Sequence, residues 1–161
     1  MTLSRSASIR LETQLDALSL VLDRASPDAI TRRPASGKWS AHENLAHLGR
    51  HHEVFIERVQ RILAEDRPRL ARYRAEEDPE WPKWAALPTD EVLRRLQALR
   101  GDLIEIVKYL SPEQLNRIGV HPAFGEMTIP EWIEFFLLHE AHHLYVMMTR
   151  IRGTSVGDSR A

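Results

Sequence analysis

Apolar residues recur along the chain at the spacing of an α-helix. The first such stretch holds Leu11, Leu15, Leu18 and Leu22, at steps of four, three and four residues, which places them on one face of an amphipathic helix. Alternating runs of β-branched residues, the usual sign of strands, do not appear. The pattern predicts four main helices, over residues 7–25, 40–66, 89–110 and 129–152.

Residues at the expected helix ends support these boundaries. Ser40 and Glu43 have the spacing of a capping box, in which a hydroxyl and a carboxylate each satisfy a free backbone amide. Pro130 suits the first turn of the fourth helix, and Gly153 suits its end. The sequence therefore predicts an all-α fold, a four-helix bundle, with a long crossover between helices 2 and 3 over residues 67–88.

Length and composition indicate one globular domain. The chain has 161 residues, of which 43% are apolar and 28% charged, ordinary values for a protein with a hydrophobic core. We expect a single domain over residues 1–153 and a flexible polar tail over residues 154–161. No apolar run reaches the roughly 18 residues that a membrane span needs, and the first ten residues lack the apolar segment of a secretory signal. We therefore expect a cytoplasmic protein with no membrane contact.

Charge and cysteine content limit the possible chemistry. The 22 basic and 23 acidic residues give a formal net charge of −1, which argues against nucleic acid as a partner. The absence of cysteine excludes disulfides, thiolate metal sites and a cysteine nucleophile. A metal site would need histidine or carboxylate ligands. Seven of the eight histidines lie in two short stretches, residues 42–52 and 139–143.

Two histidines of the fourth helix are the first candidates for metal ligands. His139 and His143 lie four residues apart, on the face that carries Trp132 and Phe136, so both point inward, whereas His142 points toward solvent. Two unpartnered imidazoles on an apolar face carry a desolvation cost, which favours a metal site. The alternative is two core histidines satisfied by hydrogen bonds.

The same stretch also matches the zinc-peptidase motif H-E-x-x-H, in which two histidines bind zinc and the glutamate activates water. The extended motif needs a histidine at position 149, where this chain has Thr149, so the peptidase interpretation has little support. A third ligand is then expected on the second helix. The apolar stripe of that helix places His51 and His52 nearer the core and His47 at its edge, so periodicity alone favours His51. The four candidates on that helix are His42, His47, His51 and His52.

The segment Gly37-Lys-Trp-Ser-Ala-His-Glu-Asn-Leu-Ala-His47-Leu, together with His139-Glu-Ala-His-His143, resembles the DinB-like superfamily of bacterial four-helix proteins. Its pattern is a Trp-Ser helix start, a histidine seven residues after the serine, and H-x-x-x-H on the fourth helix. The resemblance implies a metal triad of His47, His139 and His143, which we adopt over His51. His51 remains open as a fourth ligand or as a neighbour of the ligands. A divalent ion, commonly zinc or nickel, and a homodimer are also implied, but no substrate.

Two glutamates are candidates to orient the ligands. Glu43 precedes His47 by four residues and Glu140 follows His139, so either carboxylate could accept the free ring N–H of a ligand histidine. The alternatives are a helix cap for Glu43 and a solvated face for Glu140. Four aromatic residues either wall a pocket near the site or simply pack at helix ends: Trp39, Trp81, Trp84 and Tyr145.

Two classes of function follow from a three-histidine site. Such a site leaves positions for water or substrate, and nitrogen ligands accept zinc, nickel, copper or iron. We expect a metal-dependent enzyme acting on a small electrophile, either a hydrolase or, as the resemblance implies, a transferase that uses a low-molecular-weight thiol. The alternative is a non-catalytic bundle in which the ion joins helices 2 and 4, or a protein that acts in stress response by binding. A fourth protein ligand such as His51 would favour this alternative.

Overall fold

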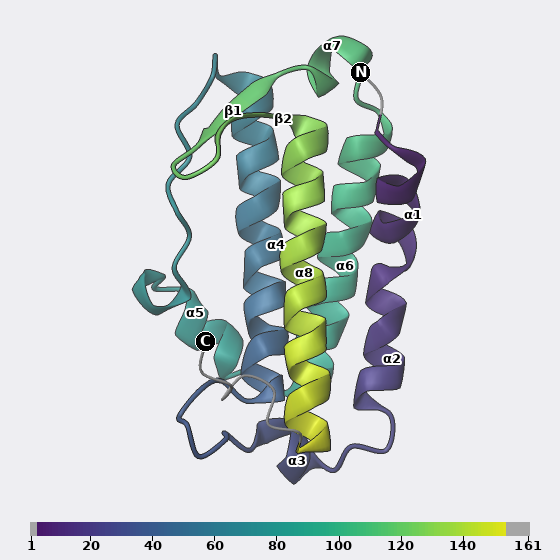
Figure 1. Cartoon of the computed structure of the whole chain (residues 1–161), viewed down its shortest axis with the longest axis vertical. Coiled ribbons are helices and arrows are strands. Elements are labelled where there is room, and N and C mark those ends of the chain that lie inside the picture. The colour runs from purple at the N-terminus through teal and green to yellow at the C-terminus, as the bar shows by residue number, and fades with distance from the viewer. Residues whose placement is uncertain (1–2, 154–161) are drawn as a thin grey trace, which may run out of the picture.

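The structure, a computed structural model, describes residues 3–153. Four long helical segments run side by side along its length (Figure 1). They are α1 (Arg5–Thr13) continued by α2 (Ala17–Leu22), α4 (Ala41–Ala64), α6 (Thr89–Lys108) and α8 (Ile129–Arg152). The predicted all-α four-helix bundle is confirmed. The tail predicted over residues 154–161 lies outside the described part of the chain.

Shorter elements connect the long helices. The 3₁₀ turn η1 separates α1 from α2, α3 precedes α4, the crossover between α4 and α6 holds η2 and α5, and α7 and a hairpin precede α8. Their bounds are η1 (Gln14–Asp16), α3 (Pro27–Thr31), η2 (Ala75–Glu77), α5 (Trp81–Ala85), α7 (Pro112–Leu115), β1 (Ile118–His121) and β2 (Gly125–Thr128).

The first predicted helix, over residues 7–25, is two helices in the structure. The interruption begins at Gln14, whose side-chain amide donates to the carboxylate of Glu140 on α8 at 2.8 Å. The second of the two helices ends early, because Asp23 adopts an extended backbone and Arg24 a left-handed one with φ 59°. Leucine spacing carries no signal for such a break, since the apolar face continues across it.

The ends of the two helices that carry the histidines are fixed by local hydrogen bonds. The predicted capping box is present: the Ser40 hydroxyl accepts from the Glu43 amide at 3.1 Å, and the Ser40 amide donates to the Glu43 carboxylate at 2.8 Å. Thr128 and Glu131 form a second capping box at the start of α8, and Gly153 ends this helix with φ 67°. Both helices therefore begin at fixed residues, which fixes the rotation of their histidines.

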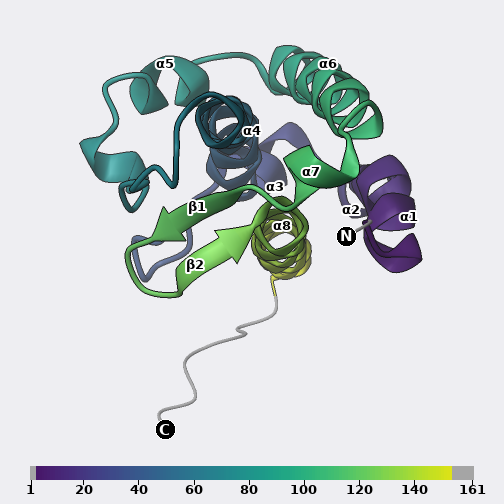
Figure 2. The ribbon, with the colours of Figure 1, turned by 90° about the horizontal axis from the view of Figure 1, so that it is seen from above.

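A two-stranded antiparallel hairpin was not predicted. β1 and β2 pair from Ile118↔Thr128 to His121↔Gly125, at the end of the bundle where α8 begins (Figure 2). Each strand has four residues, too few to show an alternating pattern. Among the described residues the sheet has two strands, in line with the prediction of no larger sheet.

The crossover packs along the outside of α4. Val120 of β1 exchanges backbone hydrogen bonds with Pro68 and Leu70, at 2.9 and 3.0 Å, which ties the start of the crossover to the hairpin. Farther along, Trp84 lies so close to α4 that a Cβ added at Gly49 would meet its ring at 2.2 Å. Position 49 therefore requires glycine, and the crossover is held against the bundle at both ends.

The core lies between α4, α6 and α8. Its largest fully buried side chains include Phe55 on α4, Leu103 on α6, and Trp132 and Phe136 on α8. Within residues 3–153, no helix combines the length and the apolar character that crossing a membrane requires. Packing of α4 against α8 brings the two histidine-rich stretches together.

Candidate metal centre

Three histidines from two helices converge between α4 and α8. His47, His139 and His143 each offer a ring nitrogen, and these nitrogens lie within 4.8 Å of one another. The Nε2 atoms of His47 and His139 are 3.2 Å apart. Two ligands of a tetrahedral zinc ion, each about 2.0–2.1 Å from it, lie roughly 3.3 Å apart. The spacing thus fits a single divalent ion, and the structure brings together the three residues that the resemblance implied.

Burial keeps all three imidazoles neutral. Burial and then neighbouring imidazoles lower the pKa of His47 to about 3 and that of His143 to about 2. The pKa of His139 falls to about 4, first through burial and then through His142. Metal ligation requires a neutral ring, so at neutral pH the three side chains are in the form that binds an ion.

Two ring nitrogens of the triad lack a hydrogen-bond partner within the described chain. The Nδ1 atoms of His47 and His139 are buried and have no hydrogen-bond partner. Leaving a buried polar group unsatisfied costs roughly 1–3 kcal/mol. The same holds for Nδ1 of His51, which is not part of the three-nitrogen group. An ion bound at the Nε2 atoms would not contact these Nδ1 atoms, so what favours a metal site is the convergence of one ring nitrogen from each of the three histidines within 4.8 Å.

Asn44 fixes the orientation of His143. Its side-chain NH₂ donates to the backbone oxygen of Ser40 at 2.7 Å, which turns its amide oxygen toward Nδ1 of His143, 2.8 Å away. His143 therefore donates from Nδ1, and its Nε2 carries the free lone pair that a metal requires. Asn44 was not singled out from the sequence. Its position one turn before His47, on the inward side of α4, is the sequence feature that could have indicated a contact with the triad.

Neither predicted glutamate takes this role. Glu43 caps α4 and accepts hydrogen bonds from the guanidinium of Arg33. Glu140 is fully buried and bonds Gln14 and Arg100, away from the triad. Within the described chain neither carboxylate bonds a ring nitrogen of the triad. The H-E-x-x-H match is therefore not used as in zinc peptidases, because its glutamate is held in an ion pair.

The remaining histidines of α4 have other surroundings. His51 is buried beside Phe136 with its ring 4.1 Å from that of His139, between centroids, but it is not part of the three-nitrogen group. Nδ1 of His52 bonds the backbone of α4 at 2.7 Å, and its Nε2 faces Arg100. His42 bonds the hydroxyl of Thr89 at 2.9 Å. The histidine that periodicity favoured thus lies next to the group, one turn farther along α4.

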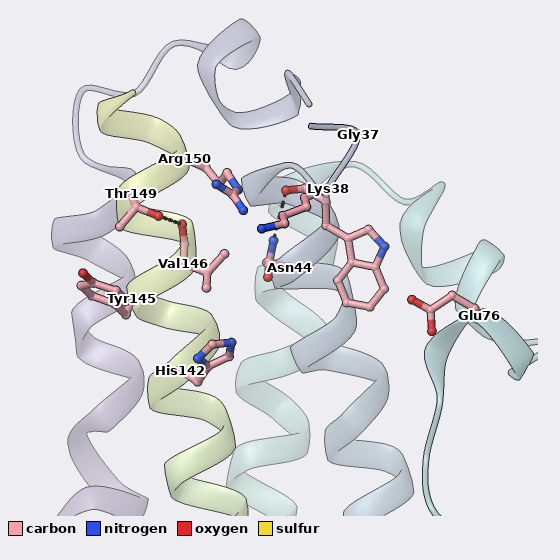
Figure 3. Close-up of a pocket in the computed structure, with 10 residues that line it drawn as sticks. Gly37, Lys38, Asn44, Glu76, His142, Tyr145, Val146, Thr149 and Arg150 are labelled. Atoms are coloured by element: carbon pink, nitrogen blue, oxygen red, sulfur yellow. Dashed lines mark hydrogen bonds between the residues drawn. The ribbon is translucent and has the colours of Figure 1, made fainter. Parts of the chain in front are cut away.

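An open pocket of about 700 Å³ is lined by residues that contact the triad, although none of the three histidines is among its lining residues (Figure 3). Its walls include Asn44, the partner of His143, and Trp39, whose ring centroid lies 6.3 Å from that of His143. His139 and His143 are themselves partly exposed. Tyr145, one of the four aromatic candidates, also lines this pocket.

Aromatic rings from three segments surround His47. The ring centroid of Trp39 lies 5.0 Å from that of His47 and 4.9 Å from that of Trp81 on α5. Tyr73 of the crossover stacks on His47, with centroids 5.6 Å apart. Trp84 has a different role, because its indole N–H donates a hydrogen bond to the carboxylate of Glu53 at 2.9 Å. The crossover thus shields His47 from water.

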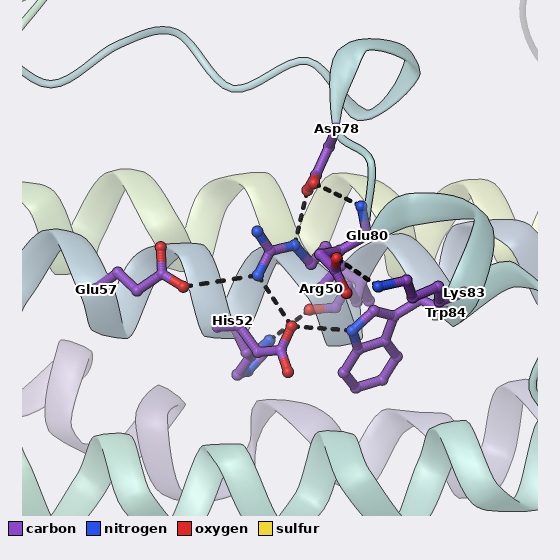
Figure 4. A network of polar contacts seen from close by, with 9 residues as sticks. Arg50, His52, Glu57, Asp78, Glu80, Lys83 and Trp84 are labelled. Carbon is purple, nitrogen blue, oxygen red and sulfur yellow. Dashed lines mark hydrogen bonds and ion pairs between the residues drawn. The ribbon is translucent and has the colours of Figure 1, made fainter.

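Arg50 holds this crossover in place (Figure 4). Its guanidinium pairs with Asp78 of the crossover at 2.7 Å and with Glu53 of α4 at 3.0 Å. The side chains of Arg50 and Asp78 are only 14% and 9% exposed, so solvent screens the pair less than a surface pair. Because Tyr73 and Trp81 flank Asp78 in the chain, the pair fixes the aromatic cover over the triad.

Comparison with known proteins identifies the family. The DinB superfamily matches residues 10–147. The chain belongs to the DinB superfamily. This confirms the resemblance drawn from the Trp-Ser start and the two histidine segments.

Two proteins of similar sequence and one solved structure resemble this DinB chain over most of its length. "Uncharacterized protein YuaE" of Bacillus subtilis is 26% identical over 86% of this chain and 90% of its own. "Putative metal-dependent hydrolase OB0413" of Oceanobacillus iheyensis is 21% identical over 84% of this chain and 78% of its own. The structure of YfiT from Bacillus subtilis, described as "a probable metal-dependent hydrolase with an unusual four-helix bundle topology", superposes with a TM-score of 0.74 at 20% identity, over 96% of this chain and 89% of YfiT. That likeness shows the fold.

Proposed function

We propose that this DinB chain is a metal-dependent enzyme in which His47, His139 and His143 hold one divalent ion, zinc or nickel. The observation that carries the proposal is the convergence of three neutral imidazoles, with an open pocket of about 700 Å³ on the other side of Asn44 and Trp39, which contact His143. Structural sites are normally closed by four protein ligands, whereas catalytic sites keep a position for water or substrate. The three-nitrogen group leaves out His51, which favours the catalytic class over a non-catalytic staple.

The proposed reaction is hydrolysis of a small electrophile. A divalent ion held by three imidazoles supplies Lewis acidity and lowers the pKa of water to about 7. The protein's own part is to keep the ligands neutral through burial, to orient His143 through Asn44, and to place the substrate in the pocket. The naming of related proteins as metal-dependent hydrolases supports this reaction class.

Transfer to a low-molecular-weight thiol is the second candidate. The resemblance to thiol-transferase relatives supports it, and the chain has no cysteine of its own, so a thiol would enter with a diffusible cofactor. The open pocket beside the triad has room for such a molecule. Both reactions would use the same three ligands.

The test begins with protein purified without a nickel column. Elemental analysis should give about one equivalent of a divalent metal. Activity is then screened against ester, amide and epoxide substrates, each with and without a small thiol, so that dependence on the thiol separates transferase from hydrolase. His139→Ala should lose the metal and the activity, whereas the exposed His142→Ala keeps both. Wild-type protein free of metal, or activity that survives in His139→Ala, would overturn the proposal.

A further inference from the structure

We propose that the pocket beside the triad holds an anionic group of the substrate, a carboxylate or a phosphate, between Lys38 and Arg150. This inference rests on the proposed function, because it places the reacting part of the same substrate at the triad. Lys38 precedes the start of α4 and Arg150 lies in the last turn of α8, and both line the pocket. In Figure 3 their charged ends lie toward the C-terminal end of α8, and His142 lies at the opposite end.

Helix geometry relates this pair of cations to the triad. Arg150 follows His143 by seven residues, close to two full turns, so the two side chains leave α8 on the same face. At 1.5 Å per residue, their backbone positions are roughly 10 Å apart along the axis. Asn44 connects the pocket to the triad, because it lines the pocket and bonds His143. A substrate anchored at Arg150 would thus reach back toward His143.

Within the described part of the chain, the two cations have no carboxylate partner. Among residues 3–153, neither Lys38 nor Arg150 forms an ion pair, in contrast to Arg33 and Arg50, which pair with carboxylates of α4. Nε of Arg150 is buried and has no hydrogen-bond partner. An unsatisfied buried donor of a charged group is costly, and an anion from outside would satisfy it. Guanidinium is well suited to carboxylate and phosphate oxygens.

The other walls of the pocket define the rest of the ligand. Trp39, Tyr145 and Val146 present apolar surface, which suits a hydrocarbon or aromatic body attached to the anionic group. Among the described residues that line the pocket, the one carboxylate is Glu76 of η2 in the crossover, which lies across the pocket from Arg150 in Figure 3. The end of the pocket formed by Lys38 and Arg150 is therefore positively charged.

Stabilisation of the end of α8 is the alternative role for Arg150. A cation in the last turn interacts favourably with the helix dipole, and Arg152 lies in the same last turn. Arg152, however, is exposed and does not line the pocket. It is therefore a matched control: its removal changes the net charge and the helix end as Arg150→Gln does, but it leaves the pocket intact.

The experiment compares 3-phenylpropionate with its neutral isostere 3-phenylpropionamide. Binding is followed by NMR on protein stripped of metal with a chelator, so that the carboxylate cannot bind an ion at the triad. The acid should bind about tenfold more tightly than the amide, and it should shift the Nε–H signal of Arg150. Arg150→Gln and Lys38→Gln should each weaken acid binding by about tenfold, with no effect on the amide. Arg152→Gln should bind like the wild type.

Two further arms keep the result interpretable. Phenyl phosphate is titrated in parallel, and its affinity is compared with that of 3-phenylpropionate. The anion that binds more tightly, phosphate or carboxylate, indicates the class of ligand. If stripping the metal abolishes the helical circular dichroism signal, the Arg150→Gln and Arg152→Gln comparison is made on metal-loaded protein, where any binding of the acid to the ion is common to both variants and cancels in the comparison. Equal affinity for acid and amide, or equal weakening by both arginine variants, would overturn the anionic subsite. Neither result depends on how much metal the triad binds, so failure here is distinct from failure of the metal proposal.

Discussion

His47, His139 and His143 act as a unit only if each supplies one nitrogen to the same ion. We expect His139→Ala, His143→Ala and His47→Ala each to lose stoichiometric metal, because two imidazoles alone bind a divalent ion weakly. Elemental analysis of protein purified without a nickel column measures this. His142→Ala is the matched control, since His142 lies on the same helix but is exposed.

His51 makes this prediction sharper. It lies one turn beyond His47, and its ring centroid is 4.1 Å from that of His139. Loss of metal in His51→Ala, together with retention in His47→Ala, would show that the helical pattern was right and the family motif misleading. One equivalent of metal in a variant lacking all three triad histidines would show that the site does not exist.

Asn44 should matter although it touches no ion. Asn44→Leu removes the acceptor for Nδ1–H of His143, which frees the ring to turn and to change tautomer. Loss of such an orienting partner typically weakens metal affinity 10–100-fold, measurable by competition with a chromophoric chelator. Asn44→Asp keeps an oxygen in place and should restore most of the affinity. Equal affinities for wild type and Asn44→Leu would exclude the orienting role.

The sequence predicts the ligands better than it predicts their surroundings. His139 and His143 stand out because two histidines on one apolar helix face are uncommon without a purpose. The choice between His47 and His51 needed the family motif, since both are buried on α4 and periodicity cannot separate adjacent turns of one face. Asn44 and Tyr73 were missed because their roles depend on contacts with α8 and with the crossover, which local spacing does not encode.

At the scale of helices, a buried ion pair joins the bundle across its core. Arg100 of α6 and Glu140 of α8 pair directly, with side chains 6% and 0% exposed. Gln14 of η1 and His52 of α4 complete the network. All four helical segments thus contribute one member. Glu140 was predicted either on a solvated face or beside a ligand, and the structure instead buries it between helices.

Breaking this pair on one side should destabilise the protein strongly. Arg100→Met leaves the carboxylate of Glu140 buried without its cation, a change that typically costs about 3–5 kcal/mol. Urea unfolding followed by circular dichroism gives the free energy of unfolding. The double variant Arg100→Met, Glu140→Met removes both charges and should recover a large part of the loss. If the double variant were as unstable as the sum of the two single ones, the charges would not be coupled.

Long helices were predictable and short elements were not. The apolar repeats of α4, α6 and α8 leave little choice of structure, and the caps at Ser40 and Gly153 mark helix ends, whereas the repeat over residues 7–25 continued across the break at Gln14. The hairpin and the short helices α5 and α7 consist of four or five residues each, too few for a period to appear. Their conformation is fixed by tertiary contacts such as that of Trp84 with Gly49.

At the scale of the whole molecule, we expect a homodimer, as the resemblance implies. The outer face of α8 supports this choice of surface, because the large apolar side chain of Leu138 is 60% exposed there. Light scattering at micromolar concentration should return twice the 18.6 kDa of the chain. Leu138→Glu should give a monomer, whereas Leu20→Glu, at a 79% exposed site on α2, should not. A wild-type mass of one chain would contradict the dimer.

The buried histidines also set how stability depends on pH. The main cause is burial, which lowers the pKa of His47 and His52 to about 3 and that of His139 to about 4. In an unfolded chain the pKa of a histidine is about 6.5. Below pH 6.5 the unfolded chain therefore binds protons that the folded chain does not. The free energy of unfolding of the metal-free protein should be highest above about pH 6.5 and should fall steadily toward pH 4. Urea unfolding at several pH values measures it.

Metal release should then coincide with unfolding. The sequence alone predicts that affinity falls below about pH 6, the range in which an exposed histidine takes up a proton. In the folded protein the highest pKa of the triad is that of His139, at about 4, so protons compete poorly with the metal at pH 5. Dialysis at stepwise lower pH should show metal and helical signal lost together, below pH 5. Release with a midpoint near pH 6 and an unchanged circular dichroism spectrum would mean that the three imidazoles are open to water, and that burial does not control this site.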